Sequence, residues 1–383
     1  MSFRDAATQA WSKAGRATWI ALAAAAVAGA LRWIAGVQPE WTEALYSRGM
    51  YPWIRSVQSA VSGLSPWSVG ELVLVALLAF VIVRGVLLVR AIARREERRL
   101  ERLLRDLLGF VRLSSWIWVV YVFTWAFHYA RLPYAHGTGL DVRPAEVGEL
   151  EAAAREWLER ARELRATLKE DTKGVVALDT DLANLRVKLA AAYERAGALD
   201  ERLAGPAPAV RNALASPLMT LGGISGIYWP FTGEPHVNSL PPAPQRLFSA
   251  LHEVAHERGF AREDEANYIA VHVGSTSGDT ELAYSVSLMA YLNLHRSLLA
   301  SDPEKAVQLA KERPEGLRRD STAIAEFWKP KSKAAERVRE VSTTMNDTYL
   351  KAQGQVHGVK SYGRMVDLLL AERRARLATP SKP

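Results

Sequence analysis

Three residues in the second half of the chain have the types and spacing of a zinc hydrolase site. Residues 251–259 read LHEVAHERG, so His252, Glu253 and His256 form an H-E-x-x-H motif. Side chains at positions i and i+4 of a helix share one face, which would let both imidazoles bind one zinc ion while the glutamate reaches a water molecule on that ion. We therefore expect His252 and His256 to be metal ligands and Glu253 to be the general base. The alternative is a pair of ordinary surface histidines.

A zinc hydrolase site needs a third protein ligand and keeps its fourth position open. The next carboxylates along the chain include Glu263 and Glu265. Glu263 precedes Asn267 by four residues, so on a second helix both would point the same way. We expect Glu263 to be the third ligand and Asn267 to orient a ligand histidine through a hydrogen bond. Glu265 is the alternative ligand, and either glutamate could instead belong to a solvated helix face.

The neighbouring residues predict the elements that hold this motif. Two prolines precede an amphipathic segment at 246–257 and Gly259 follows it, which is the pattern of a helix with a defined start and end. Before this helix, residues 218–244 are rich in glycine, proline and aromatic residues, and this composition indicates loops with one or two short strands. We expect residues 233–238, GEPHVN, to form an edge strand that could pair with an extended peptide.

A peptidase of this kind also needs a donor for the negative charge that develops on the substrate oxygen. The candidates are four residues with hydroxyl or imidazole side chains: Tyr284, Tyr268, His236 and His295. Each of them could equally be a structural residue. Residues 354–364, GQVHGVKSYGR, are expected to form a loop before the C-terminal helix, and we assign no role to His357, Tyr362 or Arg364.

Three apolar segments precede this region and have about the 20-residue length that a helix needs to cross a bilayer. They lie at 17–37, 72–89 and 113–130. Their charged residues are Arg32 and Arg84, each near one end of its segment, where a long side chain can extend to the headgroups. We therefore predict three transmembrane helices rather than buried core helices, the first of them retained and not cleaved as a signal peptide.

The basic residues of the chain are concentrated beside these segments. The chain has 49 Lys and Arg against 41 Asp and Glu, a formal net charge of +8, and residues 1–135 hold the whole excess. Nine arginines lie at or between the second and third apolar segments: Arg84, Arg90, Arg94, Arg95, Arg98, Arg99, Arg102, Arg105 and Arg112. Acidic residues are mixed among them without interleaved aromatic residues, which favours a solvated helix over a nucleic-acid-binding surface.

The same charges predict the orientation in the membrane, because basic residues beside membrane spans are retained in the cytoplasm. The basic loop at 90–112 is therefore expected to be cytoplasmic, whereas residues 38–70 contain only Arg48 and Arg55 as basic residues. We predict a multi-pass protein of the inner membrane whose catalytic domain faces the periplasm or the cell exterior. The chain has no cysteine, which excludes disulfides, thiolate metal sites and cysteine nucleophiles.

The expected fold is mainly α, with three N-terminal transmembrane helices followed by an α-rich zincin-like domain that has a small β element. Residues 1–135 would form the membrane domain, residues 136–205 a helical extracytoplasmic segment, and residues 206–383 the zincin-like domain. The helical segment is predicted from apolar residues that recur every three or four positions, with a break near 171–174.

The spacing around the motif resembles that of gluzincins, in which H-E-x-x-H is followed by E-x-x-x-D or E-x-x-A-D. Glu263, Ala266 and Asn267 stand at those positions. Asn267 departs from the usual aspartate, and the six residues between His256 and Glu263 are few for that class. The turn at Gly259 also resembles the metzincin spacing, but Arg262 stands where that class has its third histidine.

Six further stretches, read together, resemble a bacterial family of membrane proteins of unknown function with a zincin signature. They are LYSRGMYPWI, GLSPWSVGELV, WAFHYARLP, ISGIYWPFTGEPHVN, LHEVAHERGFAREDEANYIA and NDTYLKAQGQVHGVKSYGRMVDLLLA. The resemblance implies three N-terminal spans followed by a zinc-peptidase-like domain, and it implies the same site residues: His252, Glu253, His256 and Glu263.

These observations predict a membrane-anchored zinc metalloendopeptidase with Glu253 as the general base. Its cofactor would be Zn²⁺, and its partners would be the lipid bilayer and a peptide or protein substrate, with no nucleic acid. The alternative is a catalytically inactive zincin-like scaffold that binds a partner protein. A transporter or sensor is the least supported class, because it would need polar residues within the spans.

Overall fold

The computed structural model describes residues 3–94, 99–179 and 181–378 of the chain. The chain divides into two compact units. Unit 1 comprises Met1–Ile54, Leu64–Arg131 and Pro230–Thr232, and unit 2 comprises Arg55–Gly63, Leu132–Trp229 and Gly233–Pro383. The structure is mainly helical with one small sheet, as the sequence predicts.

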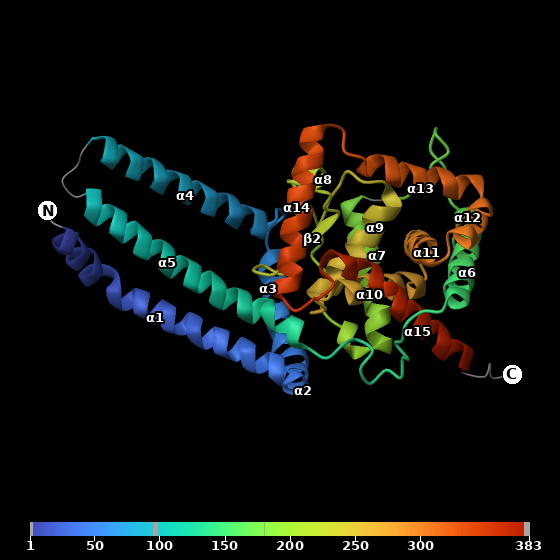
Figure 1. Cartoon of the computed structure of the whole chain (residues 1–383), viewed down its shortest axis with the longest axis horizontal. Helices are drawn as coiled ribbons and strands as arrows, with labels where there is room; N and C mark the ends of the chain where they lie inside the picture. The colour runs from blue at the N-terminus through green and yellow to red at the C-terminus, as the bar shows by residue number, and fades with distance from the viewer. Residues whose placement is uncertain (1–2, 95–98, 180, 379–383) are drawn as a thin grey trace. The chain divides into compact units, whose positions relative to one another are not determined.

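Unit 1 contains three helices that are long and apolar enough to cross a membrane (Figure 1). They are α1 (Phe3–Val37), α4 (Val69–Ala93) and α5 (Arg99–Thr124). The side chains of α4 are largely exposed and apolar, which is the pattern of a helix whose surface contacts lipid. The prediction of three N-terminal helices long and apolar enough to span a membrane is therefore confirmed.

The third span begins and ends earlier than the predicted 113–130. Helix α5 starts at Arg99 and stops at Thr124, and a short 3₁₀-helix, η2 (Ala126–Ala130), follows it. Phe127 in η2 packs against the ring of Tyr46, with the ring centroids 4.8 Å apart. Hydropathy alone places the helix end too late, because these apolar residues fill the core of unit 1 instead of continuing a helix.

The predicted basic loop at 90–112 is largely helical. Helix α4 continues to Ala93 and α5 contributes the remainder, while residues 95–98 lie outside the described residues. Arg84 of α4 forms an ion pair with Asp106 of α5. The acidic residues of this stretch thus include a partner for a neighbouring arginine, as expected for a helix with mixed charges.

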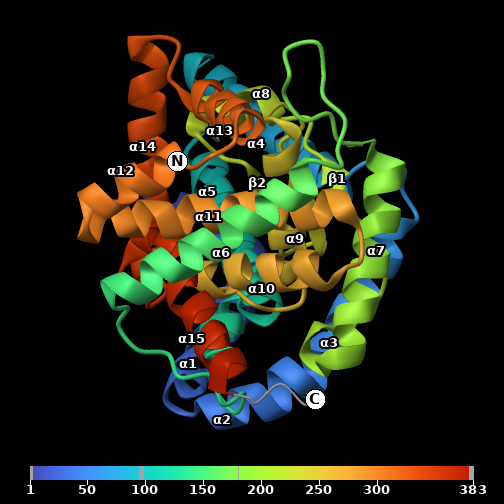
Figure 2. The same ribbon diagram turned by 90° about the vertical axis from the view of Figure 1, so that its right-hand side faces the viewer.

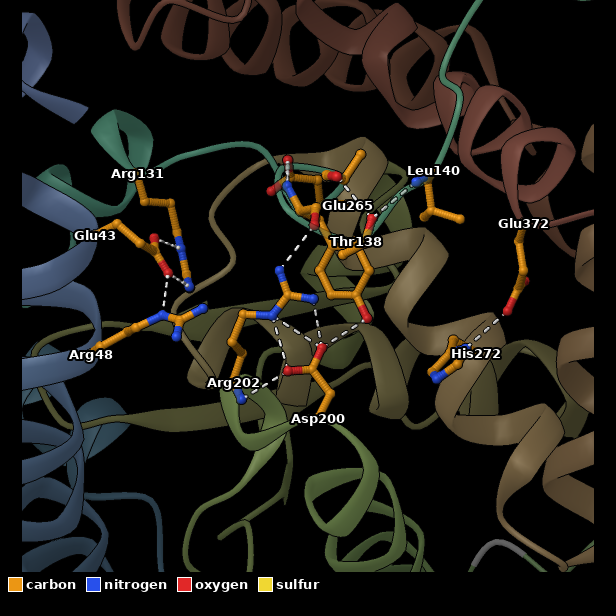
Figure 3. Close-up of polar contacts among 12 residues, drawn as sticks. Glu43, Arg48, Arg131, Thr138, Leu140, Asp200, Arg202, Glu265, His272 and Glu372 are labelled. Atoms are coloured by element: carbon orange, nitrogen blue, oxygen red, sulfur yellow. Dashed lines mark hydrogen bonds and ion pairs between the residues drawn. The ribbon is translucent and has the colours of Figure 1, made fainter. Parts of the chain in front are cut away.

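Three shorter helices connect α1 to α4: α2 (Pro39–Trp41), the π-helix η1 (Thr42–Met50) and α3 (Tyr51–Gly63). Within unit 1, Glu43 of η1 forms ion pairs with Arg131 (2.9 Å) and Arg48 (3.3 Å), as Figure 3 shows. The Arg131 side chain is 4% exposed, so this ion pair is held away from solvent.

Unit 2 is a helical domain. Its helices before the sheet are α6 (Val147–Arg165), α7 (Leu182–Leu199), η3 (Glu201–Leu203) and α8 (Ser216–Gly222). Those after it are α9 (Ala243–Glu257), α10 (Glu263–Thr276), α11 (Thr280–Ser301), α12 (Pro303–Lys311), α13 (Glu315–Trp328), α14 (Lys333–Ala352), η4 (Gly358–Arg364) and α15 (Met365–Ala378). Helices α6 and α11 lie side by side (Figure 2).

One continuous core joins the predicted segment 136–205 to the rest of unit 2. Buried apolar residues of α6 and α7, such as Leu158 and Leu189, belong to the same cluster as Leu251 of α9 and Ile269 of α10. The apolar faces of α6 and α7 are thus buried against the helices that carry the motif.

The end of α7 is also fixed by polar contacts within unit 2 (Figure 3). Asp200 accepts hydrogen bonds from the Arg202 guanidinium, with Nη2 at 2.7 Å, and from the Tyr134 hydroxyl at 3.1 Å. Arg202 in turn donates to the Tyr134 carbonyl.

The small sheet has the strand order β1 (Arg211–Asn212), β3 (Glu234–Val237), β2 (Gly226–Trp229). The segment expected at an edge, 233–238, is therefore the central strand β3. Proline usually keeps a strand at the edge of a sheet. Pro235 is accommodated here because the parallel pairing with β1 involves only His236 and Val237 of β3. The outer strand beside β3 is β2, which pairs with it in antiparallel fashion.

Candidate metal centre

Helix α9 carries His252, Glu253 and His256 on its buried face. Their exposed fractions are 7%, 4% and 5%, so these are not surface histidines on an ordinary helix. A proline in its first turn suits the start of α9, and Gly259 ends the turn after it with a φ of +84°, a conformation that favours glycine. The sequence pattern of the helix and its end thus agree with the structure.

Glu263 is the first residue of α10, and the turn after α9 brings it back onto the two histidines. Its Oε2 lies 3.2 Å from His252 Nε2 and 3.5 Å from His256 Nε2. One ligand atom from each of the three residues lies within 4.8 Å of the other two. The edges of a tetrahedron with zinc–ligand bonds of about 2.0–2.1 Å are about 3.3 Å long, so the two histidine–glutamate distances match such a site.

The histidine rings are oriented by different neighbours. His256 Nδ1 lies 2.7 Å from the Phe260 carbonyl oxygen, which accepts a hydrogen bond from it and leaves Nε2 as the atom facing Glu263. The ring of Tyr362 stacks on His252, with the centroids 6.3 Å apart and an interplanar angle of 20°. Among the described residues, His252 Nδ1 has no hydrogen-bond partner.

The charges of this cluster are strongly coupled without a metal ion. Burial alone would lower the pKa of His256, but the adjacent Glu263 carboxylate raises it to about 9. Burial alone would raise the pKa of Glu263, but the two histidines lower it to about 2. The arrangement therefore holds a negative carboxylate beside a positive imidazolium, and a divalent cation could replace the proton of the latter.

The Glu253 carboxyl group lies between α9 and strand β2. Burial is the main reason that its pKa is raised, to about 7, and the Tyr228 backbone N–H on β2 donates to it. Gly226 of β2 makes this approach possible, since a Cβ atom there would lie 2.4 Å from Glu253 Oε1. A carboxylate with a pKa near neutrality can both accept and return a proton.

We expected Asn267 to orient a ligand histidine, but its amide nitrogen has a different partner. Its Nδ2 donates to the Tyr362 carbonyl at 2.9 Å, so it fastens η4 to α10 instead. The carbonyl of Phe260 takes the expected orienting role at His256. The backbone turn after α9, which the sequence does not specify atom by atom, supplies this acceptor.

Tyr362 is the residue of this site that the sequence analysis missed. Besides its ring contact with His252, its hydroxyl hydrogen-bonds to Glu263 and lies 3.4 Å from Asn346 Nδ2 of α14. Tyr362 follows Glu253 by more than a hundred residues and lies in η4. The signal that could have found it is its place in the stretch NDTYLKAQGQVHGVKSYGR, which belongs to the same family resemblance as the motif.

The other candidates from the sequence have partners elsewhere. Glu265 accepts a hydrogen bond from the Tyr134 backbone N–H at 2.8 Å, and Tyr284 donates to the buried Asp320. His236 bonds the Glu234 carbonyl, His295 bonds the Ala306 carbonyl, and Tyr268 bonds Glu372. The partners named for these five residues do not include His252 or His256.

The residues present fit a zinc ion. Two imidazole nitrogens and one carboxylate oxygen are a donor set of catalytic zinc sites, and all three side chains are buried and close together. Glu253 Oε2 is also buried with no hydrogen-bond partner among the described residues. An unpaired buried carboxylate oxygen is costly to leave unsatisfied, which is expected where a water molecule or substrate binds.

Fold and site together define a mainly helical protein with three helices able to cross a membrane and a buried His–His–Glu cluster. The chain belongs to a family described as a protein of unknown function (DUF3810), whose model matches residues 46–370. This agrees with the expected membership of an uncharacterised family. No curated protein and no solved structure matches the chain.

Proposed function

We propose that this protein is a membrane-anchored, zinc-dependent peptidase whose site is His252, His256, Glu263 and Glu253. The observation that carries the proposal is the convergence of two histidines and Glu263, with separations of 3.2 and 3.5 Å, beside a second buried carboxylate. Structural zinc sites use all four positions for protein ligands. Three ligands with an adjacent acid-base group are typical of hydrolysis instead.

His252, His256 and Glu263 would hold the ion through Nε2, Nε2 and a carboxylate oxygen. When bound, zinc would polarise a carbonyl group and lower the pKa of a water molecule to near 7. Glu253 would accept a proton from the attacking water and return it to the leaving amine, which suits a carboxyl group with a pKa of about 7.

Tyr362 would donate a hydrogen bond to the oxygen of the substrate carbonyl as negative charge develops on it. Its hydroxyl hydrogen-bonds to Glu263, so it already lies at the cluster. Asn267 holds the backbone of Tyr362 and Asn346 lies beside its hydroxyl, and both would position this donor.

The substrate would be an extended peptide lying beside β2. The support is that β2 is the outer strand next to β3 and that its Tyr228 N–H reaches Glu253. A peptide running beside this strand would bring a scissile carbonyl close to the general base. The proposal transfers to β2 the role that the sequence had suggested for 233–238.

We further propose that the protein lies in the inner membrane with the site on the periplasmic or outer side. The support is the concentration of arginines between α4 and α5, which favours retention of that connection in the cytoplasm. With three spans, the part of the chain after α5 would then lie outside the cytoplasm.

The decisive experiment measures zinc content and peptide cleavage of the purified full-length protein in detergent. We expect about one zinc per chain and cleavage of an unstructured protein substrate. Glu253→Gln should retain zinc and lose cleavage by about 10³-fold or more. Glu253 would act both as the base for the attacking water and as the acid for the leaving amine, and the variant loses both roles. Glu263→Gln should lose zinc as well as cleavage.

Glu336→Gln is the matched control, because Glu336 is exposed on α14, and it should change neither quantity. Full cleavage by Glu253→Gln would refute the peptidase. Stoichiometric zinc without any cleavage that depends on Glu253 would favour the inactive scaffold.

A further inference from the structure

Helix α3 carries an apolar stripe on its outer face. Trp53, Val57, Val61 and Leu64 are 70%, 45%, 54% and 86% exposed. Their spacing of four, four and three residues places them along one side of the helix and its C-terminal end. We call these four residues the α3 stripe.

The opposite face of α3 is buried and carries the polar residues Arg55 and Ser62 beside the ring of Tyr51. Arg55 Nη2 donates to the Ala204 carbonyl at 2.8 Å, and the Ser62 carbonyl accepts from Arg211 Nη2 at 2.7 Å. Arg55 is the only charged residue of α3 and is 5% exposed. A surface helix in water presents polar residues outward and apolar residues inward. The exposed residues of α3 are mainly apolar, with Ser56 as the exposed polar side chain, so its outer face lacks the polar surface expected of a helix in water.

The positions of α1 and α4 in the chain say what covers this face. The segment that contains α3 lies between two apolar helices able to cross a membrane. The first of them ends at Val37, and the second begins at Val69. Only five residues separate Gly63 from Val69, and they can span at most about 18 Å. Trp67 in this connection is 70% exposed, and tryptophan is enriched where a membrane meets water.

We propose that the α3 stripe lies in the interfacial region of the bilayer that α1 and α4 cross. Helix α3 is then an interfacial helix whose exposed apolar face contacts lipid, while Arg55 and Ser62 on its other face form hydrogen bonds within unit 2. The absence of any charge on the α3 stripe favours lipid over an acidic or basic protein surface. The proposal rests on the membrane spans and does not depend on the proposed peptidase.

This placement has a consequence for the candidate metal centre. Ser59 of α3 donates to Glu257 Oε1 at 3.4 Å, and Glu257 is the residue next to His256 on α9. Helix α9, which carries the H-E-x-x-H motif, is therefore in direct hydrogen-bond contact with α3.

Site-directed spin labelling tests the proposal, and the cysteine-free chain makes single-cysteine variants simple to interpret. Val57→Cys and Val61→Cys are each labelled with a nitroxide in the full-length protein, which is reconstituted into vesicles of phosphatidylethanolamine and phosphatidylglycerol. The collision rates with oxygen, which concentrates in lipid, and with a water-soluble nickel chelate are then compared. Val83→Cys on α4 and Val307→Cys on α12, 55% and 50% exposed, are the lipid and water controls.

We expect the oxygen-to-nickel collision ratio at residues 57 and 61 to exceed that at residue 307 by at least threefold and to lie below that at residue 83. A ratio equal to that at residue 307 would show that the stripe is in water and would overturn the proposal. Low collision rates with both reagents, together with spin–spin broadening, would place a second copy of the chain on the stripe and would also overturn it. A water-like ratio at residue 83 would remove α4 as a span, and the proposal with it.

Discussion

At the scale of single residues, the ion pair between His256 and Glu263 would link the proposed metal binding to proton release. Metal binding requires a neutral imidazole, and the metal-free pKa of His256 is about 9 because of Glu263. At pH 7, zinc binding should therefore release close to one proton, and the apparent affinity should rise about tenfold per pH unit up to about pH 9. Calorimetry in two buffers with different ionisation enthalpies measures the released proton.

His272→Gln is the control, since His272 lies outside the cluster and pairs with Glu372, and it should leave the proton release unchanged. Zinc binding heats that are the same in both buffers would contradict the raised pKa. In the metal-free protein the raised pKa of His256 stabilises the fold fully below about pH 6.5, and this contribution is lost as the pH rises through about 9. The lowered pKa of Glu263 contributes above about pH 4.5 and is lost as the pH falls towards 2.

The second prediction at this scale concerns Tyr362. Tyr362→Phe keeps the ring that stacks on His252 and removes the hydroxyl that we propose as the carbonyl donor. We expect kcat to fall by about 10²–10³-fold, the range found when one such donor is removed, with unchanged zinc content. Steady-state kinetics and metal analysis of the same preparation check this. Tyr349→Phe on α14, where Tyr349 is 38% exposed, should retain activity. A loss shared by both variants would speak against the assigned role.

The sequence predicts some of these residues and not others for a physical reason. His252, Glu253, His256 and Glu263 lie within twelve residues, so helix geometry and one turn relate them. Glu265 can be separated from Glu263 by the same geometry, because residues two apart on a helix point to nearly opposite sides. The position of Tyr362 depends on how η4 packs against α10, and no local pattern encodes that contact.

At the scale of elements, strand β2 supports the site by its close approach to α9. Gly226→Ala would place a Cβ atom 2.4 Å from Glu253 Oε1, so the carboxylate or the strand must shift. Displacement of a catalytic group by about 1 Å can cost about 10²-fold in rate. We expect kcat/KM to fall by 10- to 100-fold while zinc content is retained.

Gly148→Ala is the matched control, because an added Cβ there meets nothing within 4 Å, and it should leave the kinetics unchanged. Wild-type kinetics in Gly226→Ala would mean that activity does not depend on the exact position of Glu253. That result would contradict its proposed role as a general base held against β2. Loss of zinc in this variant would instead indicate a wider distortion of α9.

The elements themselves were predictable where their signal is local. The apolar spans follow from composition, and α9 follows from its prolines, its amphipathic pattern and Gly259. The expectation that residues 233–238 form an edge strand was wrong, because the short strand β1 pairs with His236 and Val237 and places β3 at the centre of the sheet. The end of α5 was predicted too late, because Phe127 is apolar without being part of that helix. Its side chain packs against Tyr46 in the core of unit 1.

At the scale of the whole molecule, the basic residues in excess are concentrated in the N-terminal part of the chain. The excess of basic residues lies within residues 1–135, which include the connection between α4 and α5, and the remainder of the chain is balanced. Basic residues beside membrane spans favour retention in the cytoplasm, so this distribution supports the orientation proposed above. The orientation of the chain in the membrane can be tested without any measurement of enzyme activity.

Two single-cysteine variants of the full chain decide the sidedness: Arg94→Cys at the end of α4 and Val307→Cys on α12. Both positions are exposed, and the parent chain has no cysteine. In intact bacterial cells, a membrane-impermeant maleimide that passes the outer membrane should label residue 307 at least tenfold more than residue 94, because the arginine-rich connection is retained in the cytoplasm. After the inner membrane is opened with detergent, both residues should react equally. Preferential labelling of residue 94 in intact cells would invert the topology and place the His–His–Glu cluster in the cytoplasm.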